Sequence, residues 1–84
     1  MDLESKLMEM GVTLPEAPAP AANYIPFLEA AGLVFISGQV SQNESGLITG
    51  VLGDNMSIEE GYKAARCCAI SLVAQLKNAA GGDL

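Results

Sequence analysis

The segment from Asn23 to Gln39 limits the possible folds of this chain more than any other part of the sequence. Within it, Leu33 to Ile36 is an unbroken apolar run that directly follows Gly32. Successive side chains of a strand point to opposite sides of a sheet, so such a run predicts a strand that is covered on both faces. We therefore expect a β-hairpin that ends in a polar, glycine-containing tip. One helix could cover only one of its faces.

A second pattern predicts a long helix that begins after Ser57. Ser57 and Glu60 have the spacing of a capping box, and Gly81 and Gly82 are expected to stop the helix. Apolar residues recur in between at alternating spacings of four and three, at Ile58, Tyr62, Ala65, Ala69, Leu72 and Leu76. We expect this stripe to lie on the sheet, where burial contributes roughly 1.5–3 kcal/mol for each large side chain. The other side is also small or apolar, at Ala64, Cys67, Ile70 and Ala74, so a neighbouring element is expected there.

The remaining segments predict an arm and a loop. Residues 2–10 have apolar side chains at helical spacing, which indicates a short helix before Gly11, and residues 14–22 contain three prolines, which favour an extended path. Residues 41–53 are rich in glycine and polar residues, with a short third strand expected at 47–49. Their glycines lack the order and the lysine of a phosphate-binding loop.

These elements predict an α+β fold, in which one long helix crosses one face of an antiparallel hairpin sheet of two to three strands. We divide the chain into an N-terminal short helix and Pro/Ala-rich arm, residues 1–22, and a domain at residues 23–84. A chain of 84 residues buries only roughly 60–65% of its unfolded surface, so a lone monomer should be marginally stable. Its composition, 50% hydrophobic and 17% charged, still favours a core over disorder, and a partner surface would supply the missing burial.

Charge and residue types exclude several functions. The net charge is -6 and the sequence has no histidine, which argues against a nucleic-acid partner and against ribonuclease chemistry that uses histidine as a base. The sequence shows no signal peptide and no membrane-spanning run, so we expect a cytoplasmic protein without a membrane partner. Cys67 and Cys68 are the only cysteines, and neighbours on a helix point about 100° apart, which opposes a disulfide between them.

The hairpin and the elements after it resemble the opening of the YjgF/RidA family, the reactive-intermediate deaminases that also carry the label L-PSP endoribonuclease. The matching residues are Tyr24 near the start of the first strand, Gly32 in the turn, the apolar second strand and the closing Ser-Gly-Gln at 37–39. The Gly-rich loop and the helix at 47–76 follow in the family's order. The resemblance begins at Pro18 and corresponds to the first part of the family's domain. It implies a truncated member with the leading part of the chorismate-mutase-like fold.

The resemblance also implies an activity and a site. Members of the family hydrolyse a small 2-imino or 2-enamino acid to a 2-keto acid and ammonia, in a cleft between the subunits of a homotrimer, without a cofactor or metal. On this sequence the resemblance assigns Tyr24 to the pocket wall and the backbone of Ser37 and Gly38 to the pocket floor. The residues alone leave other roles open. Tyr24 could pack as an amphipathic aromatic at a strand edge, and a Ser-Gly pair is an ordinary way for a chain to leave a sheet.

The catalytic residues stay unknown, because the family's carboxylate-binding arginine lies in the later part of the domain. Arg66 is the only arginine here, and we expect it to flank the helix stripe and pair with Glu59 or Glu60. The first hypothesis is therefore a truncated imine deaminase with a half-built pocket, inactive as this chain alone. The alternative is a non-catalytic oligomerisation or small-ligand-binding module.

Overall fold

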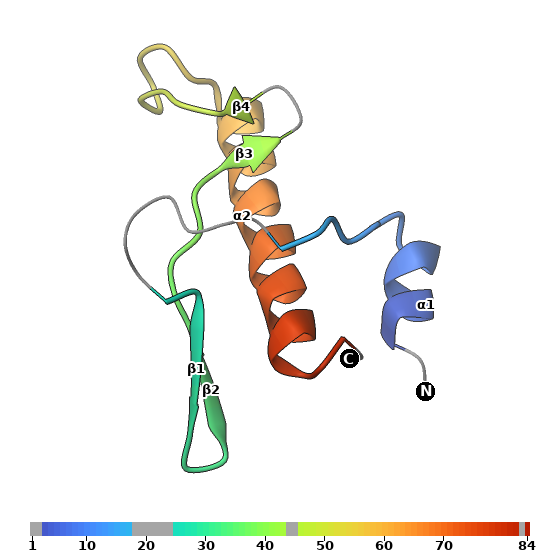
Figure 1. The fold of residues 1–84 in the computed structure, drawn as a ribbon. Coiled ribbons are helices and arrows are strands. Elements are labelled where there is room, and N and C mark those ends of the chain that lie inside the picture. Colours follow the sequence, from blue (N-terminus) through green and yellow to red (C-terminus); the bar gives the residue numbers. More distant parts are fainter. Residues whose placement is uncertain (1–2, 18–24, 44–45, 83) are drawn as a thin grey trace.

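The computed structural model describes residues 3–17, 25–43, 46–82 and 84. In chain order the elements are α1 (Leu3–Glu9), β1 (Phe27–Ala30), β2 (Leu33–Ile36), β3 (Gln42–Asn43), β4 (Gly46–Leu47) and α2 (Ile58–Ala79). Figure 1 shows α2 in the centre, with the β1–β2 hairpin on one side of it and α1 on the other. The α+β fold is therefore as predicted.

The predicted hairpin forms at β1 and β2, which pair antiparallel from Phe27 opposite Ile36 to Ala30 opposite Leu33. Ala31 and Gly32 make the turn with φ angles of 54° and 76°. Two successive residues with positive φ match the twist of the flanking strands, and this explains the glycine at the second position. Ala31 takes the same conformation with a Cβ, which is unfavourable for an L-residue.

A separate short hairpin replaces the predicted third strand. β3 pairs with β4 rather than with the first hairpin, and β4 lies at Gly46–Leu47 instead of 47–49. Ser41 closes the base of this second hairpin, because its Oγ donates to the Ile48 carbonyl at 2.8 Å and its carbonyl accepts from the Ile48 N–H at 2.7 Å. Ser41 and Ile48 therefore bond to each other, and β3 and β4 form a sheet separate from β1 and β2.

Both ends of α2 follow the sequence prediction. The Ser57 Oγ accepts from the Glu60 N–H, and the Glu60 carboxylate accepts from the Ser57 N–H, each at 3.1 Å. The hydrogen bond from the Ser57 backbone N–H, and then that with the Ser57 hydroxyl, hold the pKa of Glu60 below its ordinary value. At the other end Gly81 has a φ of 79°, and the N–H groups of Gly81 and Gly82 donate back to the Asn78 and Lys77 carbonyls. This is a Schellman ending, in which glycine takes the left-handed position.

The face of α2 that meets the rest of the protein is not the predicted one. Ser71, Ala74 and Gln75 are its buried residues, while Ile58 is 87% exposed and Tyr62 is 73% exposed. All members of the predicted core stripe are exposed, and the small-residue side packs inward instead. The prediction was wrong because α2 is apolar on two sides, and helical periodicity cannot rank two apolar sides. Small side chains allow the closer approach of backbone, which favours them at the inner side.

The hairpin strand β2 is covered on one face more than on the other. Leu33 and Phe35 are more than half exposed, whereas Val34 is 37% exposed and Ile36 is partly covered. Figure 1 shows that the hairpin tip reaches beyond the C-terminal end of α2. The radius of gyration is 14.2 Å, against about 12 Å for a compact domain of this length. Within this chain one face of β2 therefore stays open, and coverage of both faces would need a partner.

The N-terminal helix α1 forms within the predicted residues and contacts α2 through an ion pair. The Lys77 ammonium donates to a Glu4 carboxylate oxygen at 3.1 Å, and both side chains are about one-third exposed. A partly exposed pair of this kind contributes about 0–1 kcal/mol. Residues 12–17 follow without regular structure, and the rest of the predicted Pro/Ala-rich arm lies outside the described residues. Across the part that is described, neither helix has the length and hydropathy needed to cross a membrane.

Candidate functional site

The candidate site residues lie where the chain leaves β2. Ser37 follows the last residue of the strand, and its N–H donates to the Pro26 carbonyl at 2.9 Å. Its Oγ donates to the Ile25 carbonyl at 2.5 Å. The hydroxyl and the N–H of Ser37 thus close the open end of the hairpin, so its polar side chain acts as a structural group.

Gln39 fixes the backbone that follows. Its Nε2 donates to the Ser37 carbonyl at 3.1 Å and to the Gly38 carbonyl at 3.3 Å. Both carbonyls accept from one amide, so the segment 37–39 has a defined shape. We did not predict this role for Gln39, although an amide side chain that directly follows a Ser-Gly pair is a recognisable local signal.

Gly38 has open space on the side where a side chain would be. Among the described residues, no heavy atom lies within 4 Å of the place that a Cβ would take at Gly38, and the residue is exposed. Crowding within the chain therefore does not explain the glycine. A ligand could approach the backbone here, as expected of a pocket floor. Tyr24, the predicted wall residue, lies outside the described residues.

Arg66 lies elsewhere on the molecule, in the middle of α2. It borders a pocket of about 450 Å³ whose lining is Ile48, Glu60, Lys63, Arg66, Cys67 and Ile70. The expected ion pair with Glu59 or Glu60 is wrong, because the Lys77 to Glu4 contact is the salt bridge found among the described residues. This pocket combines an apolar floor with two cations and one carboxylate, a composition suited to a small amphipathic anion. The structure brings Arg66 together with Lys63, and not with Ser37 or Gly38.

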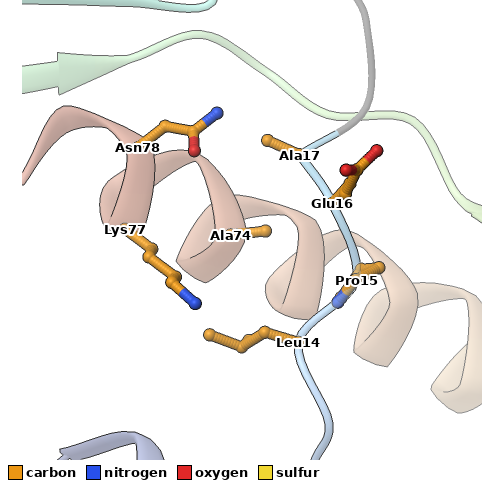
Figure 2. Close-up of a pocket in the computed structure, with 7 residues that line it drawn as sticks. All are labelled: Leu14, Pro15, Glu16, Ala17, Ala74, Lys77 and Asn78. Atoms are coloured by element: carbon orange, nitrogen blue, oxygen red, sulfur yellow. The ribbon is translucent and has the colours of Figure 1, made fainter. Parts of the chain in front are cut away.

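Figure 2 shows a third environment, between the linker and the C-terminal part of α2. This pocket of about 410 Å³ is lined by Leu14, Pro15, Glu16, Ala17, Ala74, Lys77 and Asn78. Leu14 and Ala74 extend from opposite walls. The charge of Lys77 is already paired with Glu4, so the pocket is chiefly the space where the arm lies against the helix.

The chemistry available to the described residues is limited. Cys67 and Cys68 are free thiols, both partly buried. Within residues 3–17, 25–43, 46–82 and 84, no cluster of three His, Cys, Asp or Glu residues could hold a metal ion. The groups that could bind a ligand are thus backbone at the hairpin end and cations on α2.

Fold and site together define an α+β unit in which a helix packs beside a hairpin with an ordered polar end. Residues 4–84 match the family described as "YjgF/chorismate_mutase-like, putative endoribonuclease", and the chain belongs to this family. This agrees with the resemblance inferred from the hairpin and the long helix.

Individual relatives show how the length of this chain compares with theirs. The chain is 41% identical to Protein TCP17 of Trypanosoma cruzi over 81 residues, which are 95% of this chain and 50% of that protein. It superposes with a TM-score of 0.80 on Atu1372, a protein of unknown function from Agrobacterium tumefaciens, at 36% identity over 98% of this chain and 50% of the other. It superposes with a TM-score of 0.86 on a putative endoribonuclease from Shewanella oneidensis MR-1, at 35% identity over 96% of this chain and 54% of the other. The chain thus spans about half the length of these relatives.

Proposed function

We propose that this chain supplies one wall and the floor of a site that hydrolyses small 2-imino or 2-enamino acids to 2-keto acids and ammonia. The observation that carries the proposal is the ordered backbone at 37–39, held by Ser37 and Gln39, beside open space at Gly38. Membership of the family also supports the assignment of residues 37–39 to the floor of the site.

The reaction sets requirements that these residues meet only in part. A 2-enamino acid first gains a proton at C3 and loses one from nitrogen, which gives the 2-imino acid. A water molecule then adds to C2 of the C=N group, a proton moves to nitrogen, and the C–N bond breaks to release ammonia and the 2-keto acid. Correct positioning of water and substrate can supply many kcal/mol of the barrier. Ser37 and Gly38 offer a rigid surface, but a substrate carboxylate also needs a cation such as a guanidinium. Arg66 lines pockets with α2 and linker residues, so it does not serve the segment at 37–39.

The 84-residue chain alone should therefore release ammonia from 2-iminobutyrate or 2-aminoacrylate no faster than buffer. A chimera that joins this chain to the remaining half of the Shewanella oneidensis relative should be active, in a homotrimer whose subunits share the cleft. Release of ammonia and of 2-keto acid are measured on the same samples. In the chimera, Gly38→Val should lower activity by filling the space above the floor, while Asn78→Ala on α2 should leave it unchanged.

Two outcomes would contradict this function. An inactive chimera that is folded and trimeric would remove the deaminase proposal. Turnover by the short chain that Arg66→Ala abolishes would show that the anchor is Arg66 and that we misplaced the site.

Ribonuclease activity is the function we propose to exclude, despite the family's description. The net charge is -6, and of the cations Lys6, Lys63, Arg66 and Lys77 only Lys63 and Arg66 lie together, beside the Glu60 carboxylate. Affinity for RNA depends on cations that neutralise phosphates, so binding at physiological salt should be absent. Micromolar binding of single-stranded RNA in a filter assay, lost in Lys63→Ala, would overturn this exclusion.

A second candidate function is a non-catalytic oligomerisation or small-ligand-binding module. The exposed apolar residues of α2 and β2 favour an oligomerisation module. The pocket around Lys63 and Arg66 favours a module that binds a small ligand. We also propose a cytoplasmic location, where the two free cysteines would stay reduced.

A further inference from the structure

Two pockets of the molecule share Arg66 and Ile70 of α2. The first is the pocket of about 450 Å³ that also has Lys63 and Glu60 in its lining. The second has a volume of about 210 Å³. Apart from Arg66 its lining is apolar and consists of Leu7, Val12, Leu14, Ala69, Ile70 and Val73. Because two residues line both pockets, a charged pocket and an apolar pocket adjoin each other on α2.

The charged pocket has an excess of one positive charge, because its lining contains the cations Lys63 and Arg66 and the anion Glu60. The Glu60 carboxylate accepts from the Ser57 N–H at 3.1 Å, which holds it at the start of the helix. Among the described residues, neither Lys63 nor Arg66 forms a salt bridge. The two cations are therefore available to an external anion. One excess positive charge matches a monoanion better than a zwitterion or a dianion.

The charged and apolar residues follow one another along the helix. Lys63, Arg66, Ile70 and Val73 are separated by three, four and three positions, so they form one row on the surface of α2. The first two members of the row are cations and the last two are apolar. Arg66 and Val73 are about 10 Å apart along the helix axis, a distance that an alkyl chain of medium length can span.

Burial differs between the two ends of this row in the way that an amphipathic ligand needs. Lys63 and Arg66 are exposed, so a charged group bound to them stays in contact with water and loses little hydration. Ile70 and Val73 are partly buried, and so are the residues of the N-terminal arm that face the apolar pocket, Leu7, Val12 and Leu14. An alkyl tail between the arm and α2 would be removed from water on two sides, and each buried methylene group adds to affinity.

We propose that these two pockets together bind an aliphatic monocarboxylate of medium chain length. Its carboxylate lies on the Arg66 guanidinium, which can donate two parallel hydrogen bonds, and beside the Lys63 ammonium. Its tail lies between α2 and residues 7–14. This inference rests on the small-ligand-binding candidate above and names the ligand class of that pocket. It uses neither residues 37–39 nor a second copy of the chain, so it is independent of the deaminase proposal and compatible with a trimer.

Isothermal titration calorimetry on the 84-residue chain tests the ligand class with octanoate as the probe. Octanoate should bind about tenfold more tightly than hexanoate, because two more methylene groups are buried. Methyl octanoate has the same tail without the charge, and octylamine has the opposite charge, so both should bind much more weakly. No binding of octanoate at millimolar concentration, or equal binding of octanoate and octylamine, would overturn the proposal.

Variants of the cations test where the carboxylate binds. Arg66→Gln removes the guanidinium at an exposed position, where folding should persist, and should weaken octanoate binding about tenfold. Arg66→Lys keeps the charge without the planar fork and should retain part of the affinity. Lys6→Gln removes one positive charge from an exposed position of α1 and serves as the matched control, with affinity unchanged. Circular dichroism verifies that each variant is folded. Equal affinity of folded Arg66→Gln and Lys6→Gln would contradict the proposal.

Methyl NMR during the same titration tests where the tail lies. The methyl signals of Ile70 and Val73 should shift on addition of octanoate, while those of Leu33 in β2 should not. Equal shifts at Leu33 would show unspecific binding and overturn the proposal. Binding of leucine or octylamine in this pocket without binding of octanoate would keep the small-ligand candidate and overturn the ligand class proposed here. Ammonia release is measured separately, so failure of the deaminase proposal is distinguished from failure of this inference.

Discussion

The two sides of α2 differ in a way that contradicts the simple rule that large apolar residues lie inside. The inner side is formed by Ser71, Ala74 and Gln75, which are small or polar, and Ala74 and Gln75 are each 2% exposed. The opposite side, called the outer stripe, is formed mainly by larger apolar residues: Ile58, Tyr62, Ala65, Ala69, Leu72 and Leu76. Its exposure falls along the helix, from 87% at Ile58 and 73% at Tyr62 to 37% at Leu72 and 39% at Leu76. Close approach of hairpin and linker to the helix favours small residues, whereas the larger residues remain available for an external contact. Burial within one chain and apolar character are therefore separate properties of this helix.

The largest expected effect comes from placing the same charge on each side. Ser71→Glu buries an unpaired carboxylate at a position that is 5% exposed and should destabilise the fold by about 3 kcal/mol or more, which a marginal chain of this size cannot tolerate. Ala69→Glu, measured on dilute protein, should change the free energy of unfolding by less than about 0.5 kcal/mol. Urea denaturation followed by circular dichroism measures both. Equal losses for the two variants would show that the sides do not differ.

Truncation sharpens the same comparison. Among the described residues, no buried side-chain nitrogen or oxygen lacks a hydrogen-bond partner, and Gln75 is fully covered. Gln75→Ala should cost about 1–3 kcal/mol, because it removes a satisfied buried amide and leaves its partner unpaired. Tyr62→Ala removes more atoms but should cost less than about 0.5 kcal/mol in dilute protein. A larger loss for Tyr62→Ala would place the outer stripe in the core.

The sequence predicted the ends of these elements better than their faces. The capping box at Ser57 and Glu60 and the glycine ending at Gly81 depend on residues within a few positions, so short-range patterns suffice. The turn at Gly32 is of the same kind. Which side of α2 is buried depends on the side that the hairpin approaches, and this contact joins residues far apart in the sequence. The unbroken apolar run at β2 likewise does not show whether one chain can cover both faces of the strand.

In the candidate site, too, local features could be predicted from the sequence and long-range contacts could not. Ser37 and Gly38 are recognisable from the resemblance, and their position at the end of β2 follows from the hairpin. The hydrogen bonds from Ser37 to Ile25 and Pro26 could not be predicted, because they depend on the register of the two strands. The pairing of Lys77 with Glu4 joins residues 73 positions apart and has no local signal.

A smaller loss of stability is expected from changes at the start of α2, because the capping box holds the helix as a whole and not one of its two sides. Ser57→Ala removes the accepting hydroxyl of the capping box and should cost about 1 kcal/mol. The pKa of Glu60 is lowered in the folded state, so its contribution is present above the unfolded pKa and is lost as pH falls through the folded pKa. Stability of the wild type should therefore decline on acidification more than that of Glu60→Gln. Parallel acid-denaturation curves for the two proteins would contradict this role.

The smallest effect is expected in the hairpin turn, away from α2. Ala31 has a φ of 54°, and Asn tolerates this conformation better than Ala. Ala31→Asn should stabilise the protein by about 0.5–1 kcal/mol. Ala31→Val should destabilise it, because a β-branched side chain adds strain at positive φ. The midpoint of thermal unfolding measures both, and a stabilising valine would show that the turn has another geometry.

The most direct test of the two-sided helix is methyl NMR with a soluble paramagnetic probe, applied to dilute and to concentrated protein. We expect the Ala74 methyl to be shielded from the probe at both concentrations. The methyls of Ile58, Leu72 and Leu76 should be more accessible to the probe than the Ala74 methyl at both concentrations. Shielded Ile58, Leu72 and Leu76 methyls in dilute protein, together with an accessible Ala74 methyl, would contradict the account and return the outer stripe to the core.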